Sequence, residues 1–350
     1  MVKNNKQIGI IGHFGGNEDF FDGQTIKTRI LYEEIRKSTD WKISTVDTYE
    51  KSQKPLKLFI DTIKCLIQSD DVIVLLSKNG MRFCFPLLSF WTRTFHVNIY
   101  HDVIGGNLDT YVQKYPQFKK YLNSFRLNWV ETNKLKESLQ KVGVSNCVVI
   151  PNFKRLKLEE VQYKEYKEPY RFCTFSRVTK EKGIEDAVKA VQEINHEMGR
   201  TFCSLDIYGS VDERYREQFT KLINNPYLKN VYYKGVIPYN KSVETIRNYY
   251  ALLFPTFWDG EGFPGTIIDA FSAGVPVIGT DWNSNAEIIE NEKNGILYPN
   301  AENNDLKSSI KWLINNKDKM PYIKENCILS AQKYQPDLYI KKMIDTINNS

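Results

Sequence analysis

The sequence predicts an α/β protein built from two doubly wound domains, and three observations lead to this expectation. At 350 residues the chain is longer than one hydrophobic core usually organises. Short runs rich in Val, Ile and Leu alternate with segments at helical spacing, which is typical of buried parallel sheets. Twice, at Ile8–Ile11 and at Leu252–Phe254, such a run is followed by a glycine-rich turn and a helical pattern. We therefore expect two Rossmann-like domains, over residues 1–152 and 170–335, joined by a linker at 153–169.

The composition is that of a globular protein with a mild positive charge. Hydrophobic residues make up 41% of the chain and charged residues 26%. Forty-eight Lys and Arg against 42 Asp and Glu give a net charge of +6. This excess suits a phosphorylated substrate or an anionic membrane surface and is too small to indicate nucleic acid, so we expect no nucleic-acid partner.

Neither a metal site nor a secretory route is indicated. The start of the chain lacks the apolar core of a signal peptide, and no run approaches the length that spans a bilayer, so the expected location is cytoplasmic. The six cysteines show no C-x-x-C spacing, which argues against a zinc site and a disulfide framework. They are Cys65, Cys84, Cys147, Cys173, Cys203 and Cys327. We expect no metal and no cofactor.

The first domain opens with a strand, two glycines and a helix. The strand Ile8–Ile11 leads to Gly15 and Gly16, and a helical pattern runs from about Gly23 to Lys37. Ligands of doubly wound folds lie beyond the carboxyl ends of the strands, where Gly15 and Gly16 would let the backbone approach a ligand. A tight turn alone would also explain them. Further strands are expected at Ile43–Val46, Val72–Leu76, Val97–Tyr100, Trp129–Thr132 and Val148–Ile150.

His101 directly follows the expected strand Val97–Tyr100. At that place a histidine can contact a sugar hydroxyl or carry a proton. A lone histidine is more often structural, and both interpretations stay open.

Two segments of the first domain are apolar and basic enough to pack on the sheet or to bind a membrane surface. Residues 82–93 are aromatic and apolar with basic flanks, and a second segment carries an aromatic stripe between lysines. The stripe consists of Tyr111, Tyr115, Phe118, Leu122 and Phe125. It either packs on the sheet with solvated lysines outside, or one of the two segments sits on the inner leaflet of a membrane.

The second domain begins with a strand at Arg171–Phe175 that delivers Arg177 and Lys182 to the end of its sheet. Arginine offers a fixed fork of donors and lysine a mobile point charge, so together they can neutralise a diphosphate. The alternative is that both are solvated surface side chains.

The stretch from Phe254 to Asp281 contains the most informative pattern. A strand, a turn-rich loop and a helix succeed one another, and such a helix presents its backbone N–H groups to an anion. Glu261 and Asp269 add two carboxylates that suit a polyhydroxylated ligand. Because phosphate and hydroxyl recognition coincide here, we expect a nucleotide sugar.

The wording of this stretch resembles the Glu-x7-Glu signature of the retaining glycosyltransferases of family 4. The resemblance is carried by Glu261-Gly262-Phe263-Pro264-Gly265 with Asp269, and by Ser176 to Gly183 in the form S-R-x-x-x-x-K-G. The sequence departs from the signature at Asp269, which is one methylene shorter than the family's glutamate. The resemblance implies the GT-B fold, in which two Rossmann-like domains face each other across a cleft and the last helix, here about 336–350, returns to the first domain.

The resemblance also implies roles for individual residues. Arg177 and Lys182 would hold the donor pyrophosphate, Asp269 the ribose and Glu261 the sugar. The acceptor would enter past Gly15, Gly16 and His101, of which His101 joins Glu261, Arg177 and Lys182 in the catalytic set. The remaining donor-binding residues would be Gly262, Phe263, Pro264, Gly265, Thr266, Gly209 and Val236, the last two near the nucleobase.

The resemblance implies transfer with retention at the anomeric carbon, without a metal ion. We expect a nucleotide-sugar donor, with a UDP-sugar the first choice, and a saccharide acceptor, in first place a lipid-linked oligosaccharide. The loop His13–Gly16 with Asp22-Gly23-Gln24-Thr25 looks like members that assemble bacterial surface polysaccharides.

Two other functions remain open at this point. A nucleotide-sugar 2-epimerase has the same architecture, although the Glu-x7-Glu-like loop favours transfer. The second alternative is a catalytically inactive GT-B subunit that only scaffolds a partner enzyme. The aspartate at position 269 keeps this alternative open, and the presence of Arg177, Lys182 and Glu261 argues against it.

Overall fold

The computed structural model describes residues 6–16, 23–49, 54–156, 166–299 and 305–349. The chain forms two compact units. Unit 1 comprises Met1–Arg155, Gly260–Phe263 and Gln335–Ser350, and unit 2 comprises Leu156–Asp259 and Pro264–Tyr334. Asp22, most of the expected linker (157–165) and the expected start of the terminal helices at Ala301 lie outside the described residues.

Unit 1 is built on a six-stranded parallel sheet in the order β2-β1-β3-β4-β5-β6. Its strands are β1 (Gln7–Gly12), β2 (Lys42–Asp47), β3 (Asp71–Leu75), β4 (Asn98–Asp102), β5 (Leu127–Val130) and β6 (Cys147–Val149). Its helices are α1 (Gly23–Ser38), α2 (Pro55–Gln68), α3 (Lys78–Phe95), α4 (Leu108–Lys114), α5 (Gln117–Ser124), α6 (Asn133–Lys141) and α13 (Pro336–Asn348).

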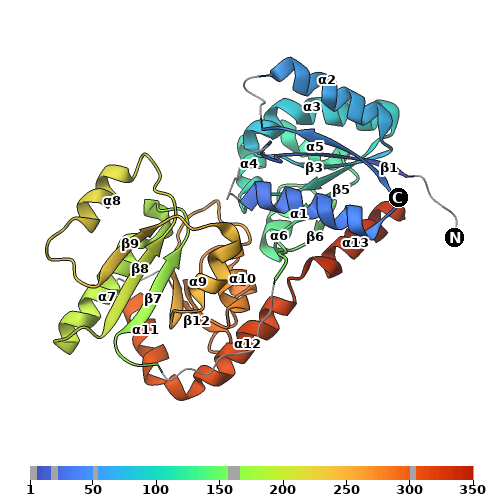
Figure 1. Ribbon diagram of the computed structural model, residues 1–350. Helices are drawn as coiled ribbons and strands as arrows, with labels where there is room; N and C mark the ends of the chain where they lie inside the picture. The colour runs from blue at the N-terminus through green and yellow to red at the C-terminus, as the bar shows by residue number, and fades with distance from the viewer. Residues whose placement is uncertain (1–5, 17–22, 50–53, 157–165, 300–304, 350) are drawn as a thin grey trace. The chain divides into compact units, whose positions relative to one another are not determined.

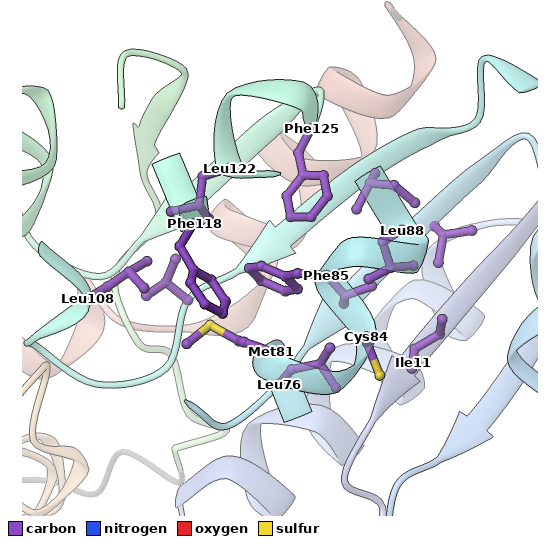
Figure 2. Close-up of a cluster of buried hydrophobic side chains, with 14 of the residues drawn as sticks. Ile11, Leu76, Met81, Cys84, Phe85, Leu88, Leu108, Phe118, Leu122 and Phe125 are labelled. Carbon is purple, nitrogen blue, oxygen red and sulfur yellow. The ribbon is translucent and has the colours of Figure 1, made fainter. Parts of the chain in front are cut away.

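Two apolar clusters lie on the two faces of this sheet. One joins side chains of α1 and α13, including Leu31, Ile340 and Met343, to the strands, and α13 runs beside α1 although the chain between them is about 300 residues long (Figure 1). The other centres on Phe85 of α3, which lies among Phe118, Phe125 and other apolar side chains in Figure 2. The sheet is therefore covered on both faces, as its nearly continuous apolar strands require.

Unit 2 repeats this plan with a second six-stranded parallel sheet, in the order β12-β11-β10-β7-β8-β9. Its strands are β7 (Tyr170–Phe175), β8 (Cys203–Tyr208), β9 (Val231–Gly235), β10 (Ala251–Phe254), β11 (Val277–Thr280) and β12 (Gly295–Tyr298). Its helices are α7 (Ile184–Met198), α8 (Arg216–Ile223), α9 (Ser242–Ile246), α10 (Gly265–Ser272), α11 (Asp305–Asn315) and α12 (Met320–Gln332). Short 3₁₀ turns lie at Lys180–Lys182, Tyr239–Lys241, Asn285–Glu287 and Lys317–Lys319.

The helices of unit 2 fall into two groups that cover its sheet. Helix α10 packs against α9 and α12, and α7 packs against α11. The two parallel six-stranded sheets confirm the predicted α/β fold class.

Each sheet has one point at which the strand order reverses. In unit 1 it lies between β1 and β3, and in unit 2 between β10 and β7. Ligands of doubly wound sheets bind beyond the carboxyl ends of the strands at such a point. The loops after β1, β7 and β10 are therefore the first places to look for a site.

The aromatic stripe of the first domain packs inward. Tyr111 of α4, Phe118 and Leu122 of α5, and Phe125 directly after α5 are buried in the Phe85 cluster, and Tyr115 packs against it partly buried. This is the packing alternative. Among the described helices, none combines the length and the apolar content that crossing a membrane requires.

Candidate functional site

The loops after β7 and β10 are fastened to each other through their backbones. Gly183 has a φ of 67°, and a Cβ placed on it would lie 2.0 Å from the carbonyl oxygen of Pro255. One step further, Phe257 N–H donates to the carbonyl of Glu181 at 2.8 Å. Glycine is needed at position 183 because both the left-handed conformation and the close approach exclude a side chain.

These loops carry the two predicted cations. Lys182 Nζ lies 4.7 Å from the ring centre of Trp258 and 5.6 Å from that of Phe254, so aromatic faces orient the ammonium group. Arg177 is exposed, with its guanidinium 3.9 Å from Asp212 Oδ2. The pKa of Asp212 is lowered, chiefly by its side-chain hydrogen bond with Arg214. Among the described residues, a long ion pair is the contact that holds the Arg177 guanidinium, so the group can turn to an incoming anion.

Helix α10 begins at the same edge, after β10. Its N-cap is Pro264, which forms no side-chain cap. The Thr266 hydroxyl is buried and, within the described part of the chain, has no hydrogen-bond partner. An uncapped helix start at the same edge of the sheet as two cations is suited to a phosphate group. Asp269 lies in the first turns of the same helix and is buried.

The residues predicted to lie near a nucleobase follow β8 and β9, which are neighbours in the sheet. Gly209 N–H donates to the carbonyl of Gly235 at 2.9 Å, and Val236 follows with an exposed side chain. Gly209 has a φ of 136°, and a Cβ there would lie 1.8 Å from the Ser176 carbonyl oxygen. The β8 loop therefore also contacts the loop that carries Arg177.

Glu261 belongs to the segment Gly260–Phe263, which packs within unit 1. Glu261 and Phe263 are buried, and Phe263 N–H donates to Glu131 Oε2 at 3.2 Å. A Cβ on Gly262 would lie 2.6 Å from that same oxygen. The sequence motif is thus divided, with Glu261 to Phe263 in unit 1 and Pro264 to Asp269 in unit 2.

The Gly15–Gly16 loop after β1 is shaped by one carboxylate. Asp47 accepts the N–H of Phe14 at 2.9 Å and that of Gly16 at 2.8 Å. Both glycines have positive φ, of 80° and 55°. Arg29 donates to the Phe14 carbonyl at 2.7 Å, so the loop is held from two sides.

His101 does not lie in a loop, contrary to the prediction. Strand β4 continues to Asp102, and the His101 ring is fully buried, with its centre 4.9 Å from that of Phe85. Its Nδ1 contacts Asn128 Oδ1 at 3.2 Å, and burial lowers its pKa to about 4. Strand β4 ends two residues later than expected, and the alternation of side chains along it places His101 on the face of the sheet that Phe85 covers. The burial of the ring favours the structural interpretation of His101, and its catalytic role stays a prediction.

Three residues of these loops were missed by the sequence analysis: Asp47, Glu131 and Trp258. Asp47 ends β2 and Glu131 directly follows β5, and a carboxylate at the carboxyl end of an expected parallel strand was a signal that could have found them. Trp258 is one of six tryptophans, and nothing in its spacing marks it as a partner of Lys182. Within the described residues, no three His, Cys, Asp or Glu side chains are grouped so as to hold a metal ion.

Residues 157–329 match the model of the family described as glycosyl transferases group 1. These residues include every predicted site residue of unit 2, as well as Glu261.

Two curated relatives and one solved structure illustrate the similarity. The chain is 25% identical over 201 residues to an uncharacterized glycosyltransferase of Methanocaldococcus jannaschii, covering 55% of this chain and 47% of the relative. It is 33% identical over 138 residues to the GtfA subunit of the UDP-N-acetylglucosamine–peptide N-acetylglucosaminyltransferase of Streptococcus pneumoniae, covering 39% of this chain and 25% of the relative.

The solved structure is that of Anabaena HepE in complex with UDP-glucose. It superposes with a TM-score of 0.75 at 12% identity and covers 98% of this chain and 100% of HepE. At this identity the likeness shows the fold. The matches to the curated relatives span less than half of those proteins' own lengths.

Proposed function

We propose that this chain is a glycosyltransferase, which moves a hexose from a nucleotide sugar to a saccharide acceptor with retention at the anomeric carbon. The acceptor that we propose is a lipid-linked oligosaccharide of bacterial surface polysaccharide synthesis. The amylovoran biosynthesis glycosyltransferase of Erwinia amylovora among the matched relatives supports this direction.

One observation carries the proposal: two cations and an uncapped helix start lie at the switch point of the unit 2 sheet. Arg177 and Lys182 follow β7, and α10 follows the neighbouring strand β10. A diphosphate at this edge would meet both side-chain cations and the positive end of the helix dipole. Asp269 and the loop at Gly209 and Val236 would take the ribose and the base.

The chemistry follows from the charge that develops on the leaving group. The acceptor hydroxyl attacks the anomeric carbon from the face that the phosphate leaves, the bond from that carbon to the phosphate oxygen breaks, and the proton passes to the departing phosphate. Arg177 and Lys182 stabilise the diphosphate as its negative charge grows, and Glu261 holds a sugar hydroxyl. No side chain has to act as a nucleophile.

Release of the nucleoside diphosphate in the presence of acceptor tests this assignment. Lys182→Ala and Glu261→Ala should each lower turnover at least about a hundredfold, the scale for one electrostatic contact made in the transition state. Lys180→Ala is the matched control, because this exposed lysine lies in the same 3₁₀ turn as Lys182. Near-normal turnover of the Lys182 and Glu261 variants would exclude their roles.

The donor that we propose first is a UDP-sugar. HepE is solved with UDP-glucose, and the pneumococcal relative is named for UDP-N-acetylglucosamine. We also propose that transfer needs no metal ion, because Arg177 and Lys182 can supply the positive charge. Loss of turnover in EDTA, restored by a divalent cation, would contradict that part.

We further propose that unit 1 rests on the cytoplasmic face of a membrane through α2 and α3. Helix α3 exposes Phe83, Phe90 and Phe95, each by more than half of its surface. Helix α2, which also contributes side chains to the Phe85 cluster, exposes Leu56 and Ile67 to a larger fraction. The two helices also carry the exposed cations Lys57, Lys64, Arg82 and Arg93. Apolar side chains with cations between them suit an anionic lipid surface.

A further inference from the structure

Three buried charged side chains of unit 1 form one ion group. Lys27 comes from α1, Asp102 ends β4 and Glu131 directly follows β5; their exposed fractions are 2%, 0% and 5%. Lys27 Nζ lies 2.7 Å from Asp102 Oδ1 and 3.1 Å from Glu131 Oε1. The ammonium group thus ties a helix to the ends of two neighbouring strands.

The charges of this group do not balance. One ammonium faces two carboxylates, and charged groups are costly to bury unless each is paired and hydrogen-bonded. Burial raises the pKa of Asp102 to about 6. For Lys27, burial acts to lower the pKa, but the charges of Asp102 and Glu131 outweigh burial and raise it. Asp102 Oδ2 has no hydrogen-bond partner among the described residues. A donor that reaches the group from elsewhere in unit 1 therefore stabilises it.

Glu131 receives such a donor from the segment that carries Glu261. Its second oxygen, Oε2, accepts the N–H of Phe263 at 3.2 Å. The carbonyl of Phe263 in turn accepts from Asn152 Nδ2 at 3.2 Å. Both backbone groups of Phe263 are therefore fixed by side chains of unit 1.

The other end of the segment is fixed as well. Gly106 N–H donates to the carbonyl of Gly260 at 3.3 Å. A Cβ on Gly106 would lie 1.9 Å from the Glu261 carbonyl oxygen, so the two backbones approach as closely as glycine allows. Glu261 is thus held between two anchored neighbours, Gly260 and Phe263.

We propose that Glu131, oriented by Lys27, is a positioning residue for Glu261, which it holds in place through the backbone of Phe263. The inference rests on the proposed function, in which Glu261 contacts the sugar of the donor. Small displacements of such a contact lower turnover strongly because the transition state demands defined geometry. Lys27 would act one step further away, by turning the Glu131 carboxylate toward the segment.

The alternative is that the ion group only fastens α1 to the sheet. Asp102 and Glu131 are a matched pair for separating the two alternatives. Both bind Lys27, and of the two, within the described residues, only Glu131 accepts a hydrogen bond from the Glu261 segment. Replacing either carboxylate by its amide leaves Lys27 with one carboxylate. If the ion group were purely structural, both replacements should change kcat and hydrogen exchange to the same extent.

The experiment compares Glu131→Gln with Asp102→Asn. The glutamine amide offers one oxygen, so it can accept from Lys27 or from Phe263 but not retain a carboxylate oxygen for each. We expect kcat to fall at least about tenfold in Glu131→Gln, on the scale of one lost hydrogen bond to a charged group, with KM for the donor within about threefold. In Asp102→Asn the fall in kcat should be clearly smaller. Hydrogen exchange of a peptide spanning residues 258–266 should speed up only in Glu131→Gln.

Asn152→Ala provides a second variant, since Asn152 is only half-buried and the change spares the ion group. It should also speed up exchange in the 258–266 peptide and lower kcat. Equal kcat and equal exchange in Glu131→Gln and Asp102→Asn, with no effect of Asn152→Ala, would overturn the inference. Normal turnover of Glu261→Gln would instead overturn the proposed function, so the two failures are distinguishable.

Discussion

Lys182 depends on aromatic neighbours for its place. Its ammonium group lies over the rings of Trp258 and Phe254, and a cation over an aromatic face gains about 0.5 to 2 kcal/mol. Since the larger ring lies closer, Trp258 should contribute most of this orientation. The Trp258 side chain is exposed, so its replacement should leave the fold intact.

Trp258→Leu should therefore lower kcat/KM by about 3-fold to 30-fold, the kinetic equivalent of that interaction. Trp312→Leu is the control, because Lys319 lies 4.8 Å over the Trp312 ring in the same unit, and Trp312 belongs to α11 and not to the loops after β7 and β10. Steady-state kinetics of both variants decide the question. If the two lose activity equally, the pairing of Trp258 with Lys182 has no special role.

His101 should make stability depend on pH. Burial lowers its pKa from 6.5 to about 4, so between these values the unfolded chain binds a proton that the folded chain does not. The free energy of unfolding attributable to His101 therefore falls as the pH falls through this window. Asp102 acts in the opposite direction, because burial raises its pKa to about 6.

Comparison with His101→Gln isolates the histidine. The stability difference between wild type and this variant should be about 2 kcal/mol smaller at pH 5 than at pH 7. Urea unfolding at both pH values measures it. An identical difference at pH 5 and pH 7 would show that the ring does not titrate as its burial implies.

Single residues also show where sequence reasoning ends. The apolar run that indicated Val97–Tyr100 contained no signal that pairing continues to Asp102. The two added residues, His101 and Asp102, therefore lie in the sheet and not in the loop after it. Lys27 follows the spacing of the buried residues Ile30, Leu31 and Glu34 along α1. A buried lysine at such a position is recognisable only when its carboxylate partners, distant in sequence, are known.

At the scale of elements, the site of unit 2 is held by close backbone contact between loops. Gly183 and Gly199 both have left-handed backbones, with φ of 67° and 62°. A Cβ would collide with Pro255 only at position 183, while nothing lies within 4 Å at position 199. Comparing substitutions at the two glycines therefore distinguishes the cost of a left-handed backbone from the cost of disturbed packing between the loops.

Gly199→Ala should cost about 1 to 2 kcal/mol of unfolding free energy, the cost of a left-handed residue with a side chain. Gly183→Ala should cost at least about 1 kcal/mol more, from overpacking, and weaken donor binding as well. Chemical unfolding and donor titration of both variants measure these effects. Equal costs would mean that the β7 and β10 loops adjust without resistance.

Most strands were predictable, because they are apolar and bounded by turns. The order in which they pair and the packing of Gly260–Phe263 with unit 1 were not. That segment is bound by backbone N–H and carbonyl groups, which every sequence has. The contribution of Glu131 could therefore not be seen from the motif that contains Glu261.

At the scale of the whole molecule, α2 and α3 should govern membrane association. Phe90→Ser combined with Phe95→Ser should lower binding to anionic liposomes about tenfold or more, because each phenylalanine contributes its apolar area to insertion. Tyr227→Ser, at an 84% exposed aromatic of unit 2, is the control. Sedimentation at low salt measures binding. Wild-type protein that stays in the supernatant would exclude the proposed membrane surface.

The central claim is that the switch point of the unit 2 sheet binds a nucleotide-sugar diphosphate, and thermal stability tests it most directly. Unfolding midpoints would be measured against UDP-, GDP-, ADP- and dTDP-sugars, for the wild type, Lys182→Ala and Lys180→Ala. Binding to the folded state raises the midpoint, so we predict a rise with UDP-sugars that Lys180→Ala retains and Lys182→Ala loses. No rise with any of the four donor classes, or a rise that Lys182→Ala leaves unchanged, would contradict the account.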